Sequence, residues 1–258
     1  MTTAPAGRSP TEQSGGNQAA EMDRMYRLTR HIYDLTRAYY LLGRDRMLAH
    51  VATGPGTATL EVGCGTARNL IKLARRPQPG LLCGLDASQE MLDTAAASIT
   101  RAGVPAAGLE PIRLRQGLAE GLDAKAMFDR DEPFDTIFFS YCLSMVPTWP
   151  GAIEAALANL RSGGLLLIVD FWDQKDLPGP FAAGLKRWLA LFHVHYRPEV
   201  HEALVQLGHS GRADVAFDSI AFMRSTWKLW TLSRLPSRHL WTTCSPSTRP
   251  PDPLRMRQ

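Results

Sequence analysis

The sequence predicts an α/β fold in which an open, mainly parallel sheet is covered by helices on both faces. From about residue 59 onward, short apolar runs alternate with stretches of helical periodicity. The run 134–141 is apolar enough to form a central strand that is buried on both faces. At 258 residues, the chain is long enough for one such domain with additional terminal segments.

The first strand and its exit, residues 59–74, carry the main functional signal. Gly63 and Gly65 stand where a chain leaving a strand must turn sharply and bring its backbone close to a ligand. The helical spacing that follows directs backbone N–H groups and a helix N-terminus into the crevice at the strand ends. A dinucleotide-binding turn would need a glycine at Arg68, which disfavours NAD or FAD.

This stretch resembles motif I of the class I S-adenosylmethionine (AdoMet) dependent methyltransferases, which reads acid-x-G-x-G-x-G. Ala67 stands where the fullest version has its last glycine. The resemblance implies a Rossmann-like, seven-stranded sheet with helices on both faces and an N-terminal helical lead-in. It also implies that the turn passes under the amino-acid tail of AdoMet, which assigns four residues to the cofactor: Glu61, Gly63, Cys64 and Gly65. The alternative is a turn that binds nothing, since many α/β proteins contain one.

A second apolar run, residues 81–86, ends in Asp86 about 20 residues after the glycine turn, where a carboxylate can bind both hydroxyls of a ribose. The following residues fit the D-x-S-x-x-M-L continuation of the same family. The resemblance therefore assigns Asp86, Ala87 and Met91 to the nucleoside, with Met91 flanking the adenine. The alternative is that Asp86 only caps the next helix.

Two later strand exits complete the expected site. The loop after a third strand at 111–115 matches the family position that meets the adenine, which assigns Gln116, Gly117 and Leu118 to the cofactor. An ordinary strand-exit turn is the alternative there. The exit of the fourth strand, residues 140–147, is where the acceptor is expected to meet the methyl group. By resemblance, Ser140 contacts the cofactor and Tyr141 faces the sulfonium.

Four segments are expected along the chain. Residues 1–20 form a disordered leader because their composition cannot bury enough apolar surface. Residues 21–58 form a helical substrate or lid segment, residues 59–227 the methyltransferase domain, and residues 228–258 a poorly ordered tail. One stripe of the lead-in combines aromatic rings with cations, in Tyr26, Arg30, Tyr33 and Arg37, and these can bind ammonium and acidic groups. A solvated, basic helix is the alternative.

Charge and cysteine content narrow the class of protein. The net charge of +4 and pI of about 9.0 are compatible with an anionic membrane surface or with nucleic acid. The four cysteines form no C-x-x-C pair and the histidines show no metal-ligand spacing, so neither a metal site nor a disulfide scaffold is expected. No apolar run approaches the roughly 20 residues that span a bilayer. We therefore expect a cytoplasmic enzyme that contacts the membrane only peripherally, on its inner face, and binds no nucleic acid.

Residues 22–48, 60–74 and 192–198 resemble the BtaB-type diacylglycerylhomoserine N-methyltransferases of betaine lipid biosynthesis. The resemblance implies three successive methylations of a lipid amine at the membrane surface, giving diacylglyceryl-N,N,N-trimethylhomoserine. It also suggests the aminocarboxypropyl transferase that makes the precursor as a partner. In this hypothesis the rings of Tyr26, Tyr33 and Tyr141 surround the growing cation, and Arg30 or Arg37 binds the homoserine carboxylate.

Three other functions remain open on the sequence alone. The same enzyme class could act on phosphatidylethanolamine or on a quinone precursor. The alanine at position 67 leaves room for a non-catalytic module that binds AdoMet or lipid without turnover. An NAD-dependent oxidoreductase is the third alternative, which the arginine at position 68 disfavours.

Overall fold

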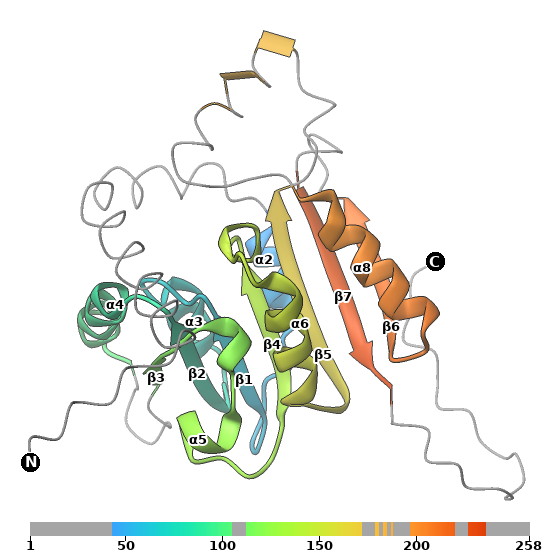
Figure 1. Ribbon diagram of the computed structural model, residues 1–258. Helices are drawn as coiled ribbons and strands as arrows, with labels where there is room; N and C mark the ends of the chain where they lie inside the picture. Colours follow the sequence, from blue (N-terminus) through green and yellow to red (C-terminus); the bar gives the residue numbers. More distant parts are fainter. Residues whose placement is uncertain are drawn as a thin grey trace, which may run out of the picture.

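The computed structural model describes residues 43–104, 112–171, 179–180, 183–184, 187, 197–219 and 227–235. These residues contain a seven-stranded sheet with the strand order β3-β2-β1-β4-β5-β7-β6 (Figure 1). The strands are β1 (Ala58–Val62), β2 (Leu81–Asp86), β3 (Arg113–Gln116), β4 (Phe134–Ser140), β5 (Leu160–Phe171), β6 (Ala213–Ser219) and β7 (Trp227–Arg234). Strands β1 to β5 are parallel, whereas β7 lies antiparallel between β5 and β6.

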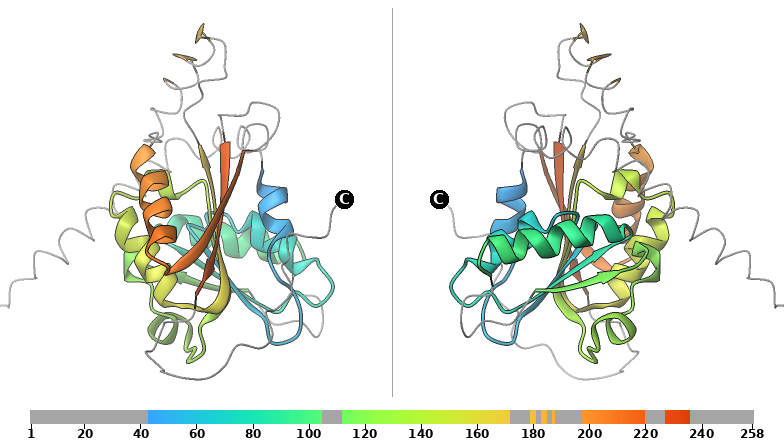
Figure 2. Two further views of the ribbon diagram at one scale, coloured as in Figure 1. Left: turned by 90° about the vertical axis from the view of Figure 1, so that its right-hand side faces the viewer. Right: turned by 90° about the vertical axis from the view of Figure 1, so that its left-hand side faces the viewer.

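Helices cover both faces of the sheet, as Figure 2 shows from two sides. Three helices contribute to the apolar core on one face: α2 (Arg44–Ala49), α3 (Arg68–Ala74) and α4 (Gln89–Arg101). Three others contribute to the core on the opposite face: α5 (Ala124–Phe128), α6 (Trp149–Ala158) and α8 (Pro198–His209). Two short 3₁₀ turns, η1 (Ala119–Gly121) and η2 (Leu143–Met145), follow β3 and β4. The expected α/β sheet with helices on both faces is therefore confirmed.

The centre of the sheet is the most deeply buried part of the fold. Every residue of β1 is buried, and so are six of the seven residues of β4. The chain order runs outward from β1 to β2 and β3, then returns to β4 on the other side of β1. In an open α/β sheet, ligands bind in the crevice where the strand order reverses, at the carboxyl ends of the strands. The topology thus places the expected turn after β1 at that crevice.

The C-terminal part of the sheet differs from the expectation. The sequence predicts a closing antiparallel hairpin with strands at 213–217 and 219–224, but the second strand of the hairpin is β7, which runs from Trp227 to Arg234. The expectation of a poorly ordered tail starting at residue 228 is therefore wrong for 228–234. Trp230 and Leu232 of β7 are buried against the helices of one face, which gives this strand its apolar side.

The sequence also predicts a turn at 161–164 and a fifth strand at 165–170, but β5 is longer and includes the residues of that turn. Helix α8 was not anticipated, although its Val200, Leu204 and Leu207 have the spacing of one helical face and are buried. The leader, the helical lead-in up to residue 42 and the residues beyond 235 lie outside the described residues. Within the described part of the chain, no helix combines the length and apolarity needed to cross a bilayer.

Candidate cofactor and methyl-transfer site

Backbone hydrogen bonds hold the turn after β1 against the end of β2. The N–H groups of Gly63 and Cys64 both donate to the carbonyl oxygen of Leu85, at 2.8 and 3.0 Å. Gly63 and Gly65 have φ angles of 70° and 51°, in the left-handed region that glycine adopts without steric cost. Ala67 also has a positive φ of 60°, which explains why the family pattern has a glycine in that position.

Asp86 connects this turn to the start of α4. Its Oδ2 accepts a hydrogen bond of 2.7 Å from the N–H of Gly65, and its Oδ1 accepts one of 3.0 Å from the N–H of Ser88. Ser88, not Asp86, caps α4, because its hydroxyl accepts from the N–H of Met91. A carboxylate has about four acceptor positions, so it can accept hydroxyl groups of a ligand as well as backbone N–H groups.

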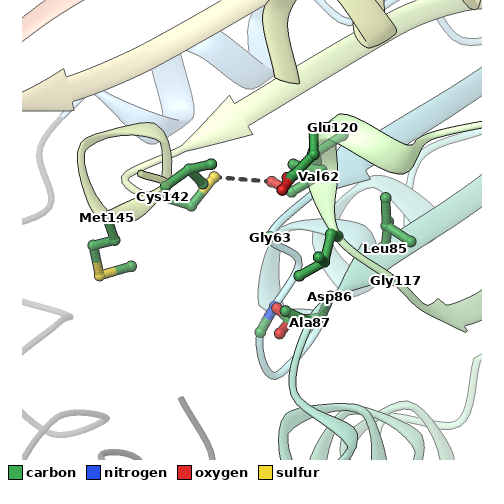
Figure 3. Close-up of a pocket in the computed structure, with 13 residues that line it drawn as sticks. Val62, Gly63, Leu85, Asp86, Ala87, Gly117, Glu120, Cys142 and Met145 are labelled. Carbon is green, nitrogen blue, oxygen red and sulfur yellow. Dashed lines mark hydrogen bonds between the residues drawn. The ribbon is translucent and has the colours of Figure 1, made fainter. Parts of the chain in front are cut away.

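A cavity with an empty volume of about 700 Å³, part of which is open to solvent, lies at this crevice. Figure 3 shows Cys142 and Met145 on one side of it and Asp86 and Ala87 on the other, with Gly63 between them. We call it the adenosine cavity. Its lining is mostly apolar and comprises Val62, Gly63, Gly65, Leu85, Asp86, Ala87, Gly117, Leu118, Ala119, Glu120, Cys142, Met145 and Val146.

A second, polar cavity of about 390 Å³ shares Gly63 with the first. We call it the tail cavity. It is lined by Arg44, Glu61, Gly63, Cys64, Thr66, Arg68, Asn69 and Ser140. Glu61 is buried and accepts a hydrogen bond of 2.7 Å from the amide of Asn69. Among the described residues, no hydrogen-bond partner is present for the buried hydroxyl of Ser140. A ligand with a polar end would satisfy this hydroxyl.

Most of the sequence-predicted cofactor residues meet at these two cavities. Gly63, Gly65, Asp86, Ala87, Gly117 and Leu118 line the adenosine cavity, and Glu61, Gly63, Cys64 and Ser140 line the tail cavity. Two predicted residues line neither one. Met91 is a residue of α4, and its side chain is buried in the core between that helix and the sheet. The amide of Gln116 donates to the carbonyl oxygen of Ala87 at 3.1 Å.

Tyr141 lies in the core between the sheet and helices α2 and α3, and it does not line the adenosine cavity. Its φ angle of 57° is unusual for a residue other than glycine, and it turns the chain so that the next residue, Cys142, reaches the cavity. Burial raises the pKa of the Tyr141 hydroxyl well above its usual range, and the nearby Asp170 carboxylate adds to the rise. The hydroxyl is therefore neutral.

Burial also keeps the thiols of the site protonated. It raises the pKa of Cys142 well above the usual range of a thiol, with an added contribution from the Asp170 carboxylate. The same holds for Cys64, where the Asp86 carboxylate adds to the effect of burial. The thiol of Cys142 donates to the carbonyl oxygen of Val62 at 3.0 Å, the contact drawn in Figure 3. Neither group is a thiolate nucleophile at neutral pH.

Residues 59–164 match the family model described as a methyltransferase domain. The chain thus contains a class I AdoMet-dependent methyltransferase domain. The phosphatidylethanolamine N-methyltransferase of Cereibacter sphaeroides is 36% identical to it over 151 residues, which cover 58% of this chain and 66% of that relative. The match therefore spans about two thirds of the relative's length.

Solved structures share the fold of this methyltransferase domain at low sequence identity. A possible histamine N-methyltransferase from Thermotoga maritima superposes with a TM-score of 0.57 at 16% identity, over 82% of this chain and 99% of that one. Phosphoethanolamine N-methyltransferase 2 of Haemonchus contortus, in complex with S-adenosyl-L-methionine, superposes with a TM-score of 0.56 at 13% identity. The match covers 74% of this chain and 53% of that one. The predicted fold, enzyme class and cofactor are confirmed.

The residues of the methyltransferase domain fit AdoMet. The apolar adenosine cavity suits the adenine, and Asp86 offers acceptors to the ribose hydroxyls. In the tail cavity, Arg44 and Arg68 can bind the carboxylate of the amino-acid tail, and the hydroxyl of Ser140 can meet its ammonium group. Sequence reasoning missed Arg44 and Arg68, and within the exit of β4 it singled out Tyr141 instead of Cys142, Met145 and Val146.

Within the described part of the chain, no group of three or more His, Cys, Asp or Glu side chains is arranged to hold a metal ion. The predicted substrate residues Tyr26, Arg30, Tyr33 and Arg37 lie outside the described residues.

Proposed function

We propose that the protein transfers the methyl group of AdoMet to the amine of diacylglycerylhomoserine, three times in succession, to give the trimethylated betaine lipid. The name of the relative from Cereibacter sphaeroides indicates an amine of a lipid head group as acceptor. The resemblance of residues 22–48 and 192–198 to the betaine lipid enzymes favours the homoserine head group over ethanolamine.

The observation that carries this proposal is the uncharged wall at the exit of β4. Cys142, Met145 and Val146 line the adenosine cavity, with Cys142 and Met145 opposite Asp86, and the thiol of Cys142 is protonated. The other carboxylate that lines this cavity, Glu120, belongs to η1 and not to the exit of β4. A carboxylate at that wall would keep an acceptor amine protonated and unreactive, whereas thiol, thioether and alkyl groups do not. The wall therefore suits a neutral amine that becomes a permanent cation.

Bound AdoMet supplies an electrophilic methyl group on a positively charged sulfur. The lone pair of the acceptor amine forms the new N–C bond as the S–C bond breaks, and the bonding electrons return to the sulfur of S-adenosylhomocysteine. In each of the first two transfers, the ammonium product must lose one proton to water before it can react again. The third transfer leaves a quaternary ammonium group. Alignment and exclusion of water can supply much of the rate, so no strong acid or base is needed.

In this proposal, the rings of Tyr26 and Tyr33 surround the cationic head group and Arg30 or Arg37 binds the homoserine carboxylate. The sequence groups Tyr141 with these rings, but its side chain is buried in the core and does not line the adenosine cavity. The lipid amine is reached at the inner face of the cytoplasmic membrane. The aminocarboxypropyl transferase that makes the precursor is the proposed partner.

The experiment uses AdoMet with a labelled methyl group and vesicles that contain one lipid amine at a time, followed by lipid chromatography. The vesicles carry diacylglycerylhomoserine or phosphatidylethanolamine, and a quinone precursor is tested in parallel. The expected result is label in mono-, di- and trimethylated homoserine lipid, and much less label with Asp86→Ala at an AdoMet concentration near the Kd of the wild type. Label in phosphatidylethanolamine or in the quinone alone would replace the proposed acceptor. AdoMet binding without transfer to any acceptor would favour a non-catalytic module.

A further inference from the structure

The wall at the exit of β4 depends on an unusual turn. Tyr141 adopts a left-handed conformation and its N–H donates to the carbonyl oxygen of Val169 on β5, at 2.8 Å. Residues in such conformations persist only where their surroundings hold them, and they occur preferentially at functional sites. The turn directs Cys142 toward the adenosine cavity, and the 3₁₀ turn η2 then brings Met145 to the same cavity.

Ser144, in the middle of η2, is held by two residues that are distant in sequence. Its N–H and its hydroxyl donate to the two oxygens of Asp170 at the end of β5, each at 2.9 Å. The Nε of Arg197, just before α8, donates to the carbonyl oxygen of Ser144 at 3.0 Å. Every polar group of Ser144 is therefore engaged, and both Ser144 and Asp170 are buried.

We propose that Asp170 and Arg197 are positioning residues that hold the β4-exit wall at the point of methyl transfer. Neither residue lines the adenosine cavity, and both contact the wall segment at Ser144. The inference rests on the proposed methyl transfer but not on the identity of the acceptor. The wall stands on the β4 side of the turn at Gly63, while Asp86 and Gly117 stand on the β2 and β3 side.

Because the wall lies at the proposed point of methyl transfer, disturbing it should change kcat more than the Kd for AdoMet. Acceptor and methyl carbon must meet in line, and a displacement of about 1 Å can reduce the rate about 10²-fold. The turn at Gly63 and the carboxylate of Asp86, which are the proposed cofactor contacts, are held by hydrogen bonds that do not include Ser144. Loosening Ser144 should therefore reduce turnover much more than cofactor affinity.

The test compares Ser144→Ala, Asp170→Asn and Arg197→Gln with the control Arg212→Gln. Arg212 forms an exposed ion pair with Glu154, at 2.6 Å, and it does not line either cavity. The expected result is a fall in kcat of about 10- to 100-fold in the three variants, with the Kd for AdoMet changed less than threefold. Arg197→Lys, which keeps a donor and a charge, should recover much of the lost kcat. The control should keep its kcat.

Amide hydrogen exchange provides a readout that does not require an acceptor. Exchange in residues 142–146 should be about tenfold faster in the three variants, and unchanged in residues 63–67 and 86–91. If the wild-type protein methylates no lipid amine, the proposed function fails while exchange still tests the positioning role. Unchanged exchange and kcat would overturn the inference. So would a parallel loss of kcat, AdoMet affinity and folded fraction, which would indicate a purely structural role.

Discussion

The carboxylate of Asp86 accepts a hydrogen bond of 2.7 Å from the backbone N–H of Gly65, and this contact joins the ends of β2 and β1 at the centre of the crevice. The same carboxylate lines the adenosine cavity, so one side chain both fixes the turn and faces the ligand. The acid about 20 residues after the glycine turn is therefore placed where a ribose would lie.

Replacement of Asp86 by alanine should weaken AdoMet binding about 10- to 100-fold, because hydrogen bonds to a charged acceptor contribute about 1.5–3 kcal/mol each. Isothermal calorimetry with AdoMet measures the change. Asp93→Asn, on the exposed side of α4, is the matched control and should bind as the wild type does. An unchanged Kd in Asp86→Ala would remove this residue from the cofactor site.

A side chain at Gly63 should destabilise the fold and close the cofactor site. A Cβ built on Gly63 would lie 2.6 Å from the Cβ of Cys142, and φ is +70°. Left-handed strain and overpacking together predict that Gly63→Ala lowers the free energy of unfolding by about 2–4 kcal/mol. Urea titration provides the measurement. Gly121→Ala is the control, because a Cβ there would have no neighbour within 4 Å. Equal stability of the two variants would contradict the packing described around the turn.

Removal of the positive charge of Arg44 should weaken the binding only of ligands that carry the amino-acid tail of AdoMet. Arg44→Gln is expected to weaken binding of S-adenosylhomocysteine about tenfold or more, since Arg44 lines the tail cavity. It should leave the affinity for 5′-methylthioadenosine, which lacks the carboxylate and ammonium groups, unchanged. Arg46→Gln, on the exposed side of α2, controls for the loss of a positive charge. Equal weakening of both ligands by Arg44→Gln would argue against this assignment of the cavity.

If the rings of Tyr26 and Tyr33 surround the head group, replacing one of them should reduce turnover without a similar loss of AdoMet affinity. Tyr33→Ala should reduce kcat for the lipid amine far more than it weakens AdoMet binding, because an aromatic face attracts the cationic head group and not the nucleoside. Phenylalanine at the same position keeps the ring and should retain most of the activity. Steady-state kinetics and calorimetry on the three proteins check this. Similar effects on kcat and on AdoMet affinity would remove Tyr33 from the acceptor side.

Stability should fall at alkaline pH through Cys83, which lies within β2. Burial raises the pKa of this thiol to about 12, from 9.0 for an exposed thiol. Because the folded pKa is the higher one, the stabilisation is complete below pH 9 and is lost as the pH rises toward 12. Between pH 8 and 10.5, the wild type should lose about 2 kcal/mol more of its free energy of unfolding than Cys83→Ala. Urea titrations at the two pH values give this difference, and equal losses would show that Cys83 does not titrate as described.

The strands that form the cofactor crevice could be predicted because their sequences are unambiguous. Strands β1, β2 and β4 are almost continuously buried, since helices cover both of their faces, and most of their residues are apolar. Strand β7 is harder to recognise. Its apolar side is restricted to alternate residues such as Trp230 and Leu232, within a segment rich in Ser, Thr and Arg. Composition suggested a poorly ordered tail there, while the alternation was the better signal.

The β4-exit wall, formed by Cys142, Met145 and Val146, shows what could not be predicted from the sequence. Residues of the β4 exit line the adenosine cavity, but the residue after the strand that reaches it is Cys142 and not Tyr141. A one-residue difference at the end of a strand moves a side chain to the opposite face. The left-handed turn at Tyr141 that decides between them depends on contacts with β5, which have no local sequence signature. Likewise, Arg44 reaches the tail cavity only through the packing of α2 on α3.

The most direct test of the central claim is a crystal structure of the protein with S-adenosylhomocysteine. We expect the adenosine in the cavity of Asp86 and Leu118, the ribose hydroxyls on the Asp86 carboxylate, and the amino-acid tail beyond Gly63 between Arg44 and Ser140. The sulfur should then face the wall formed by Cys142 and Met145. A crystal in which both cavities remain empty at saturating ligand, or in which the nucleoside binds elsewhere, would contradict the account.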